Sequence, residues 1–257
     1  MSLFDWPRKY YQSGGGNPYV GYVVFGDIKQ PLNLSASKYR SAGVPQGVQI
    51  SSYTAERHAE TFRFFLESSF LKALTTEDPT LVKAVLAQKQ CVELRGEVKD
   101  PPTLNYFRDA LGLVTCLLDQ GGVAVLDVQI LKWWSPVEWH KQIFDHGQAY
   151  PRHHVVIQIT PEEGNKEWFH TRGMRKFGRP DISVRGVTSQ YRNAVIDLCN
   201  RFIEMQAFGA IISEGQEIQM ESLPPGMRAH HWGSVDDLAF NNVHIEIAWP
   251  VKGKGEP

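Results

Sequence analysis

The chain of 257 residues carries a formal net charge of −1, with 42% hydrophobic and 21% charged residues. These values exclude a disordered or collagen-like chain, and the balanced charge provides no global field that would attract nucleic acid or an anionic membrane. Nucleic acid is therefore not an expected partner. No run of about 18 apolar residues occurs, so we expect neither a transmembrane helix nor a membrane partner.

The cysteines and the N-terminus indicate the compartment. Cys91, Cys116 and Cys199 lie far apart in apolar segments, as reduced thiols of a cytosolic core do, and no CxxC zinc motif is present. The first 18 residues contain charged side chains and lack the apolar stretch of a secretory signal. We therefore expect a cytoplasmic protein of bacterial type. Because no glycine-rich nucleotide motif is present, we expect no cofactor.

Residue patterns in the first half predict strands that alternate with helices. Runs of β-branched, aromatic or alternating apolar residues predict strands at 19–25, 47–51 and 91–98. Apolar residues at spacings of three and four predict a helix capped by Thr54, a helix at 79–89 capped by Asp78, and a helix at 103–120. The polar residues from 27 to 45 predict a long loop.

The second half begins with the apolar run at 123–128, which is typical of a strand buried on both faces. Ser135 and Glu138 form a capping-box pattern for a short helix to residue 144. Further strands are predicted at 154–160, 182–187, 216–221 and 243–249. A helix is predicted after Thr188 or Ser189. Residues 223–233 are predicted to form a loop, and the tail at 252–257 is expected to be disordered.

These elements predict an α+β fold with a mostly antiparallel sheet and helices on one face. From residue 123, strand, helix, strand, strand, helix and strand follow in the βαββαβ order of a ferredoxin-like unit, with extra strands near Trp168 and Gln216 as insertions. The predicted organisation is a loose N-terminal arm at 1–18, an α/β portion at 19–121 and a ferredoxin-like portion at 122–250. We expect these parts to form one compact unit.

The most unusual stretch is residues 168–187, WFHTRGMRKFGRPDISVRGV, called the arginine-rich segment below. It contains four arginines, one lysine and one histidine, interrupted by three glycines and one proline. Glycine gives the backbone freedom to turn, and Pro180 favours an extended conformation of Arg179. We therefore expect residues 177–181 to turn the chain into the strand at 182–187.

The arginines of this segment allow two interpretations. In the first interpretation, three guanidinium groups converge on a carboxylate or phosphate, those of Arg172, Arg175 and Arg179. Guanidinium groups pair with such anions through two parallel hydrogen bonds. In the second they bind carbonyl or acidic groups of neighbouring loops and fix the turn, as many ionic clusters in proteins do. The first interpretation makes these three residues the candidate ligand-binding site.

The histidines suggest a catalytic group more readily than a metal site. His170 is the candidate catalytic residue, acting as acid or base if a cleft brings it to Asp181 or Glu167. Neighbouring histidines occur twice, but adjacent side chains of a strand point to opposite faces. No HExxH, HxH or CxxC spacing is present, so we expect no metal site.

The pattern T-x-G-M-x-x-F-G-x-P-D-I at residues 171–182 is followed by a helix and by a glycine-containing turn at 214–217. It resembles a bacterial family catalogued as a domain of unknown function, over about residues 122–249. The resemblance implies no activity or catalytic residue, because none is established for that family. Arg172, Arg175 and Arg179 lie partly at the variable positions of its pattern.

Two functions follow as hypotheses. The first is a binding or regulatory module that engages a partner protein or a small anion through the loop at 170–185. The alternative is a hydrolase or transferase that acts on an anionic substrate, with Arg172, Arg175 and Arg179 as the clamp and His170 as the acid or base. A binding module predicts an exposed apolar patch near the arginine-rich segment. The enzyme predicts one pocket lined by His170 and at least two of the arginines.

Overall fold

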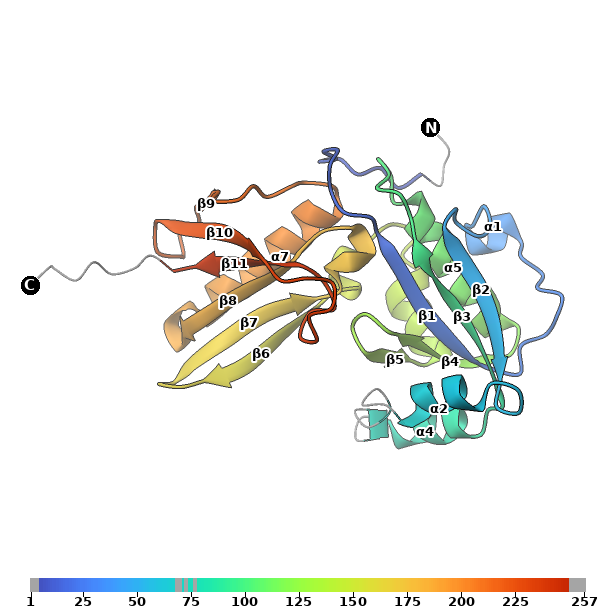
Figure 1. Cartoon of the computed structure of the whole chain (residues 1–257). Helices are drawn as coiled ribbons and strands as arrows, with labels where there is room; N and C mark the ends of the chain where they lie inside the picture. The colour runs from blue at the N-terminus through green and yellow to red at the C-terminus, as the bar shows by residue number, and fades with distance from the viewer. Residues whose placement is uncertain (1–4, 68–70, 72–73, 76–77, 250–257) are drawn as a thin grey trace, which may run out of the picture. The chain divides into compact units, whose positions relative to one another are not determined.

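The computed structural model describes residues 5–67, 71, 74–75 and 78–249 (Figure 1). The chain folds into two compact units. The first unit consists of Met1–Pro7 and Asn17–His153, and the second consists of Arg8–Gly16 and His154–Pro257. The boundary expected between residues 121 and 122 lies inside the first unit. The tail predicted to be disordered lies outside the described residues.

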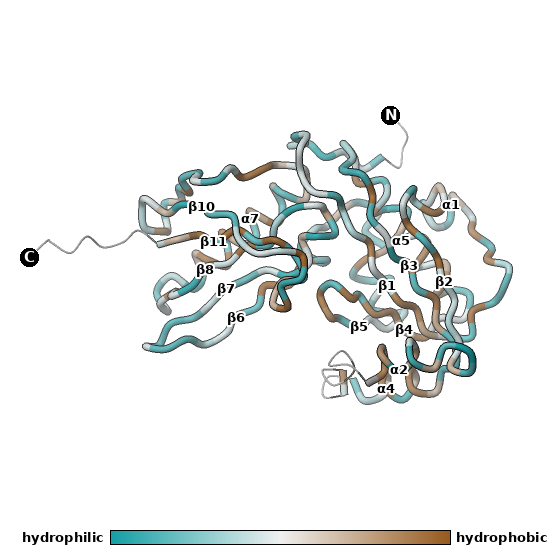
Figure 2. The backbone as a smooth tube through the Cα atoms, in the orientation of Figure 1, coloured by the Kyte–Doolittle hydropathy of each residue, from teal (hydrophilic) through white to brown (hydrophobic). Residues whose placement is uncertain are grey.

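The first unit is built on a five-stranded antiparallel sheet with the strand order β2-β3-β1-β4-β5. Its strands are β1 (Tyr19–Gly26), β2 (Val48–Thr54), β3 (Gln90–Glu97), β4 (Gly122–Asp127) and β5 (Lys132–Trp134). The apolar runs of β1 and β4 explain their inner positions, because both faces of these strands are buried. Figure 2 shows the same two strands as hydrophobic stretches.

Helices cover both faces of this sheet. On one face α2 (Ala59–Glu67) and α4 (Pro79–Leu86) pack against the strands, and the ring of Phe25 lies 5.7 Å from that of Phe62. On the other face Thr115 of α5 (Asn105–Asp119) accepts a hydrogen bond from the indole of Trp139, whose ring contacts Tyr22.

Among the helices of the described residues, none combines the length and the hydrophobicity that crossing a bilayer requires.

Local signals set several helix ends. The Asp78 carboxylate accepts two backbone N–H groups of α4, which confirms the predicted cap. The capping box of Ser135 and Glu138 is also confirmed, at the start of α6 (Pro136–Trp139), which continues as the π-helix His140–Phe144. The prediction that Thr54 caps a helix is wrong. Thr54 is the last residue of β2, where it pairs with Gln90, and α2 begins only at Ala59.

The second unit contains a six-stranded sheet and one long helix. Its strands, in the spatial order β6-β7-β8-β11-β10-β9, are β6 (Val156–Glu162), β7 (Lys166–Arg172), β8 (Asp181–Thr188), β11 (His244–Ala248), β10 (Met227–Trp232) and β9 (Glu217–Ile218). Among the described strand pairs of this sheet, only β8 and β11 are parallel. The helix α7 (Arg192–Ala207) covers one face through Val195, Leu198 and Phe202. The expected α+β class, with a mostly antiparallel sheet, is confirmed.

The expected ferredoxin-like order is not found. Its first strand, at 123–128, corresponds to β4, which pairs with β1 and β5 in the sheet of the first unit. In the second unit three strands precede α7 and three follow it. The apolar run of β4 predicts a buried strand correctly, but any buried sheet satisfies such a run. Pairing with β1, which is distant in the sequence, decides which sheet β4 joins.

The strand β10 lies where the sequence predicts a loop, at 223–233. It pairs antiparallel with β11 along its length, from Arg228 opposite Ala248 to Trp232 opposite His244. Met227 and Ala229 are buried on the core face, whereas Arg228 points away from it and is exposed. The small side chain of Ala229 and the polar sequence around it obscure this alternation.

Residues 8–16 of the predicted loose arm are held by hydrogen bonds in the second unit. The Arg8 side chain is 3% exposed and donates from Nη2 to Phe177 O at 2.8 Å and from Nε to Ala207 O at 3.1 Å. Tyr10 N donates to Phe208 O. Because buried carbonyl groups need donors, Arg8 stabilises both the turn at Phe177 and the end of α7.

We predict that Arg8→Ala lowers the free energy of unfolding by about 1.5–3 kcal/mol, because it leaves buried carbonyl groups unpaired. The matched control is Arg201→Ala. Arg201 forms an exposed ion pair with Asp197 on α7, and loss of such a pair costs about 0.5 kcal/mol or less. Urea denaturation of the full chain measures both changes. Equal losses for the two variants would contradict the structural role of Arg8.

Candidate functional site

The arginine-rich segment forms β7, a single 3-10 turn at Met174–Phe177, and β8. Gly173 and Gly178 flank the turn with φ angles of 123° and 62°, which favour glycine. The predicted turn into the strand is therefore present. Its fold brings side chains of β7 and β8 beside the loop 233–243, which joins β10 to β11 and is called the β10–β11 loop below.

Asp181 connects these parts. Its carboxylate is fully buried and accepts hydrogen bonds from Thr171 Oγ1 at 2.8 Å, Met174 N at 3.2 Å and Asn242 Nδ2 at 2.9 Å. Desolvation raises the pKa of Asp181 to about 6, although the hydrogen bonds from Asn242 and Thr171 oppose that rise. Asn242 also donates to Arg179 O at 2.9 Å, so it anchors the end of the β10–β11 loop.

Two of the candidate arginines hold the same loop. Arg172, 8% exposed, donates from Nη1 to Leu238 O at 3.0 Å and to Ala239 O at 2.8 Å. Arg175 donates from Nη1 to the backbone and side-chain oxygens of Asn241, at 3.3 and 3.4 Å. Both guanidinium groups therefore bind main-chain oxygens of the β10–β11 loop.

Arg179 binds a different part of the unit. Its side chain is 3% exposed and donates to the carbonyl oxygens of Gly178, Gly209, Ala210 and Gln12. The structure therefore brings Arg172 and Arg175 to one loop but turns Arg179 to another. The three arginines fix turns through carbonyl oxygens, as the second interpretation of the sequence expects, and do not converge on one point.

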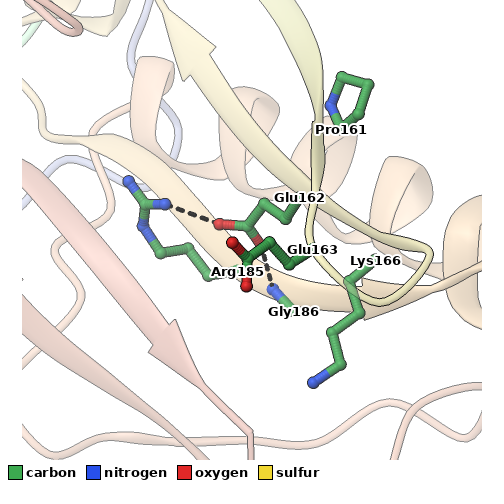
Figure 3. A pocket seen from close by; sticks show the side chains of 6 residues that line it. All are labelled: Pro161, Glu162, Glu163, Lys166, Arg185 and Gly186. Atoms are coloured by element: carbon green, nitrogen blue, oxygen red, sulfur yellow. Dashed lines mark hydrogen bonds and ion pairs between the residues drawn. The ribbon is translucent and has the colours of Figure 1, made fainter.

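The fourth arginine lines an open surface groove (Figure 3). The groove is formed by Pro161, Glu162, Glu163, Lys166, Arg185 and Gly186. Glu162 accepts hydrogen bonds from Arg185 Nη1 at 2.7 Å and from Gly186 N at 2.8 Å, and the guanidinium carbon lies 3.8 Å from the ring centre of Trp168. The charge of Arg185 is thus balanced by Glu162, so this arginine already has an acidic partner within the groove.

His170 lies on the sheet face opposite α7, where it is 5% exposed. Its ring stacks on Trp168 at 4.1 Å and contacts Phe240 at 5.4 Å, and Nδ1 has no hydrogen-bond partner among the described residues. Desolvation, together with the nearby charges of Arg172 and Arg185, lowers its pKa to about 4. His170 is therefore neutral near pH 7, and its role is to pack beneath Phe240.

The acidic partners considered for His170 are engaged elsewhere. Glu167 forms an ion pair with Arg192, and Asp181 accepts from Thr171, Met174 and Asn242. No group of three His, Cys, Asp or Glu side chains that could hold a metal ion occurs among the residues that the structure describes. The acid–base pair proposed from the sequence is thus not assembled.

The β10–β11 loop is a feature that the sequence did not single out. Phe240 is 4% exposed and anchors the loop by stacking on His244, with ring centres 4.0 Å apart. Apolar side chains around this anchor are exposed instead: Trp232 by 63%, Val235 by 46%, Leu238 by 93% and Val243 by 38%. A pair of acidic residues between apolar ones, in WGSVDDLAF, is the signal that could have identified it.

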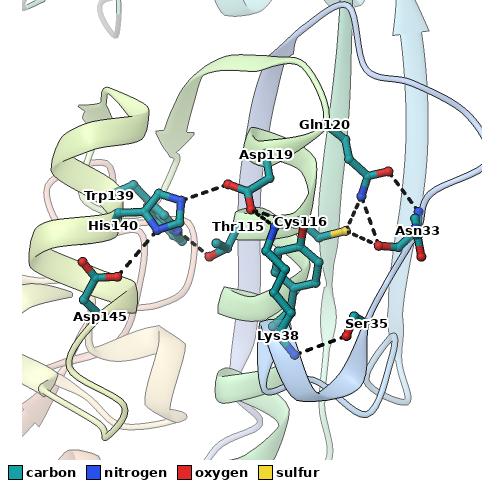
Figure 4. A network of polar contacts seen from close by, with 11 residues as sticks. Asn33, Ser35, Lys38, Thr115, Cys116, Asp119, Gln120, Trp139, His140 and Asp145 are labelled. Atoms are coloured by element: carbon teal, nitrogen blue, oxygen red, sulfur yellow. Dashed lines mark hydrogen bonds and ion pairs between the residues drawn. The ribbon is translucent and has the colours of Figure 1, made fainter.

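A second polar cluster lies in the first unit (Figure 4). Asp119, at the end of α5, binds Lys38 Nζ at 2.6 Å and His140 Nε2 at 3.0 Å. Burial alone would raise the pKa of Asp119, but hydrogen bonds from Lys38 and His140 lower it below its usual value. The cluster ties the short helix α1 (Ala36–Tyr39), within the predicted long loop, to α5 and the π-helix. We assign it a structural role.

The three cysteines are free thiols and all are buried. Desolvation raises the pKa of Cys199 to about 12, so this residue is an inert core thiol.

No known protein family, curated protein or solved structure matches the chain.

We predict that Arg172→Ala leaves the second unit folded but increases the mobility of the β10–β11 loop. The reason is that the carbonyl groups of Leu238 and Ala239 lose their donor. Amide hydrogen exchange of residues 236–241 should accelerate by tenfold or more, which corresponds to about 1.4 kcal/mol of local stability. Arg228→Ala is the control, since the exposed Arg228 side chain binds Gly215 O instead. Unchanged exchange in Arg172→Ala would show that other contacts suffice to order the loop.

We predict that the stability difference between the wild type and His170→Phe depends on pH. The pKa of His170 is about 4 when folded and 6.5 ordinarily, so below pH 6.5 the unfolded chain binds a proton that the folded chain excludes. His170 therefore contributes stability that is present above pH 6.5 and is lost as the pH falls towards 4. Phenylalanine keeps the stacking but does not titrate.

The comparison with the variant is required because Asp181 acts in the opposite direction. Its folded pKa of about 6 exceeds the usual value of 3.8, so its contribution falls as the pH rises from 3.8 to 6. That contribution is common to both proteins and cancels in the difference. Urea denaturation at pH 7, 6, 5 and 4 measures the difference, and parallel pH curves would contradict the role given to His170.

Proposed function

We propose that the chain is a protein-binding module whose second unit presents the β10–β11 loop to a partner protein. The observation that carries this proposal is Leu238, an apolar side chain that is 93% exposed although the backbone carrying it is fixed by Arg172. Single exposed apolar side chains are common on protein surfaces, but a group of them, here Trp232, Val235, Leu238 and Val243 on one loop and its base, is typical of an interaction site. Because the loop is already ordered before binding, less conformational entropy is lost when the partner binds.

The arginine-rich segment takes part in this function as a support. Arg172 and Arg175 bind the loop from one side, and the Asp181 carboxylate binds it through Asn242. A small anion at these arginines has less support, because their donors already bind carbonyl oxygens. The alternative of an enzyme for an anionic substrate lacks support for the same reason, and because His170 is buried and neutral near pH 7. A cytoplasmic setting belongs to the proposal, as the buried free thiols suit a reducing compartment.

The experiment compares proteins that co-purify with the full tagged chain and with two variants. The double variant Trp232→Ser, Leu238→Ser removes the two most exposed apolar groups near the loop, and Val137→Ser removes one that is 77% exposed on α6. We expect a protein retained by the wild type and by Val137→Ser but lost from the double variant. Its measured Kd should weaken at least tenfold, as expected for the loss of interface anchors. If the double variant retains every protein that the wild type binds, the proposal is wrong.

A further inference from the structure

The β10–β11 loop has a surface that combines apolar and acidic groups. From Trp232 to Trp249 the sequence contains no lysine or arginine, while Asp236 and Asp237 lie directly between Val235 and Leu238. Asp236 is exposed and Asp237 is half-buried. Of the two arginines that hold the loop, Arg172 is buried against carbonyl oxygens, and Arg175, which is half-buried, donates to Asn241. The charged side chains of the loop itself, Asp236 and Asp237, are therefore both negative.

The loop is also ordered from within. Asp237 N donates to Ser234 O at 3.1 Å, Asp237 Oδ1 accepts from Ala239 N at 2.9 Å, and Phe240 N donates to Asp237 O at 3.2 Å. These bonds form consecutive turns on either side of Asp237. Leu238 is 93% exposed and therefore projects from a loop that these hydrogen bonds order.

We propose, resting on the function proposed above, that the partner is a protein with an apolar pocket bordered by lysine or arginine, and that the pocket receives Leu238. An apolar pocket is the complement of a single projecting leucine, and a basic rim is the complement of Asp236 and Asp237. The same negative charge repels nucleic acid and anionic lipid. Trp232 and Val243, at the base of the loop, contact the surface around the pocket.

The test begins with the full chain carrying p-benzoylphenylalanine at Val235, which leaves Leu238 in place. Photo-crosslinking is carried out in the cells that express the chain. Mass spectrometry then identifies the crosslinked partner. The association rate and Kd of the purified partner are then measured at several salt concentrations for wild type, Leu238→Ser, Asp236→Lys and Glu163→Lys. Glu163 is the matched charge control, since it is exposed on the turn between β6 and β7. Asp236 is preferred to Asp237 because the carboxylate of Asp237 supports the turn.

We expect Leu238→Ser to weaken the Kd at least tenfold. Asp236→Lys should slow association several-fold at low salt and flatten its salt dependence, whereas Glu163→Lys should not, because the charge at the rim of an interface acts mainly on the association rate. If Leu238→Ser weakens binding but Asp236→Lys behaves like Glu163→Lys, the basic rim is refuted while the proposed function stands. If Leu238→Ser binds as the wild type does, the proposed function fails as well.

Two further measurements distinguish other occupants of the loop. Wild-type chain is mixed with vesicles of phosphatidylcholine, with and without phosphatidylserine, and binding that depends on Leu238 would overturn the proposal in favour of a lipid surface. Sedimentation velocity of the chain alone detects self-association, and a dimer that Leu238→Ser abolishes would identify a second copy as the occupant instead. We expect no vesicle binding and no loop-dependent dimer.

Discussion

The buried carboxylate of Asp181 is the interaction on which the rest of the candidate site depends. It joins three separate pieces of chain, because Thr171 lies on β7, Met174 in the turn and Asn242 in the β10–β11 loop. A carboxylate removed from water is costly unless hydrogen bonds compensate it. Each piece supplies one such bond, so the carboxylate is stable only where all three pieces meet. This requirement couples the shape of the turn to the position of the loop.

The arginines follow the same rule with the opposite charge. A guanidinium group has five N–H donors, and at 8% or 3% exposure water cannot satisfy them. Arg172 and Arg179 use carbonyl oxygens at loop ends and helix ends, where the main chain has acceptors without intrahelical or ladder partners. An arginine used in this way has its donors occupied by the fold. In the proposed function, it contributes to recognition only indirectly, through the backbone that it orders.

The sequence predicts those parts of the fold whose signals are local. The strand at 19–25, the Asp78 cap and the capping box at Ser135 depend on neighbouring residues, and the structure has all three. The sheet that β4 joins depends on β1, about a hundred residues earlier in the sequence, and no local pattern encodes that pairing.

The candidate site is predictable to a similar extent. The arginine-rich segment is identified from its composition, and the turn within it from its glycines and Pro180. The directions of the arginine side chains are not, because they depend on where the carbonyl groups of distant loops lie. The exposure of Leu238 is equally hidden from the sequence. It depends on the position of the loop, which Phe240 anchors by stacking on His244 once β10 and β11 are paired.

The use of main-chain oxygens as the contacts of Arg172 has an evolutionary consequence. A carbonyl group is present whatever side chain the residue carries, so the support holds the backbone at positions 238 and 239 irrespective of sequence. The outward side chains at 235, 236 and 238 are then free to change without disturbing the fold beneath them. In the proposed function, a lineage can alter which partner this surface binds by substituting a few exposed residues.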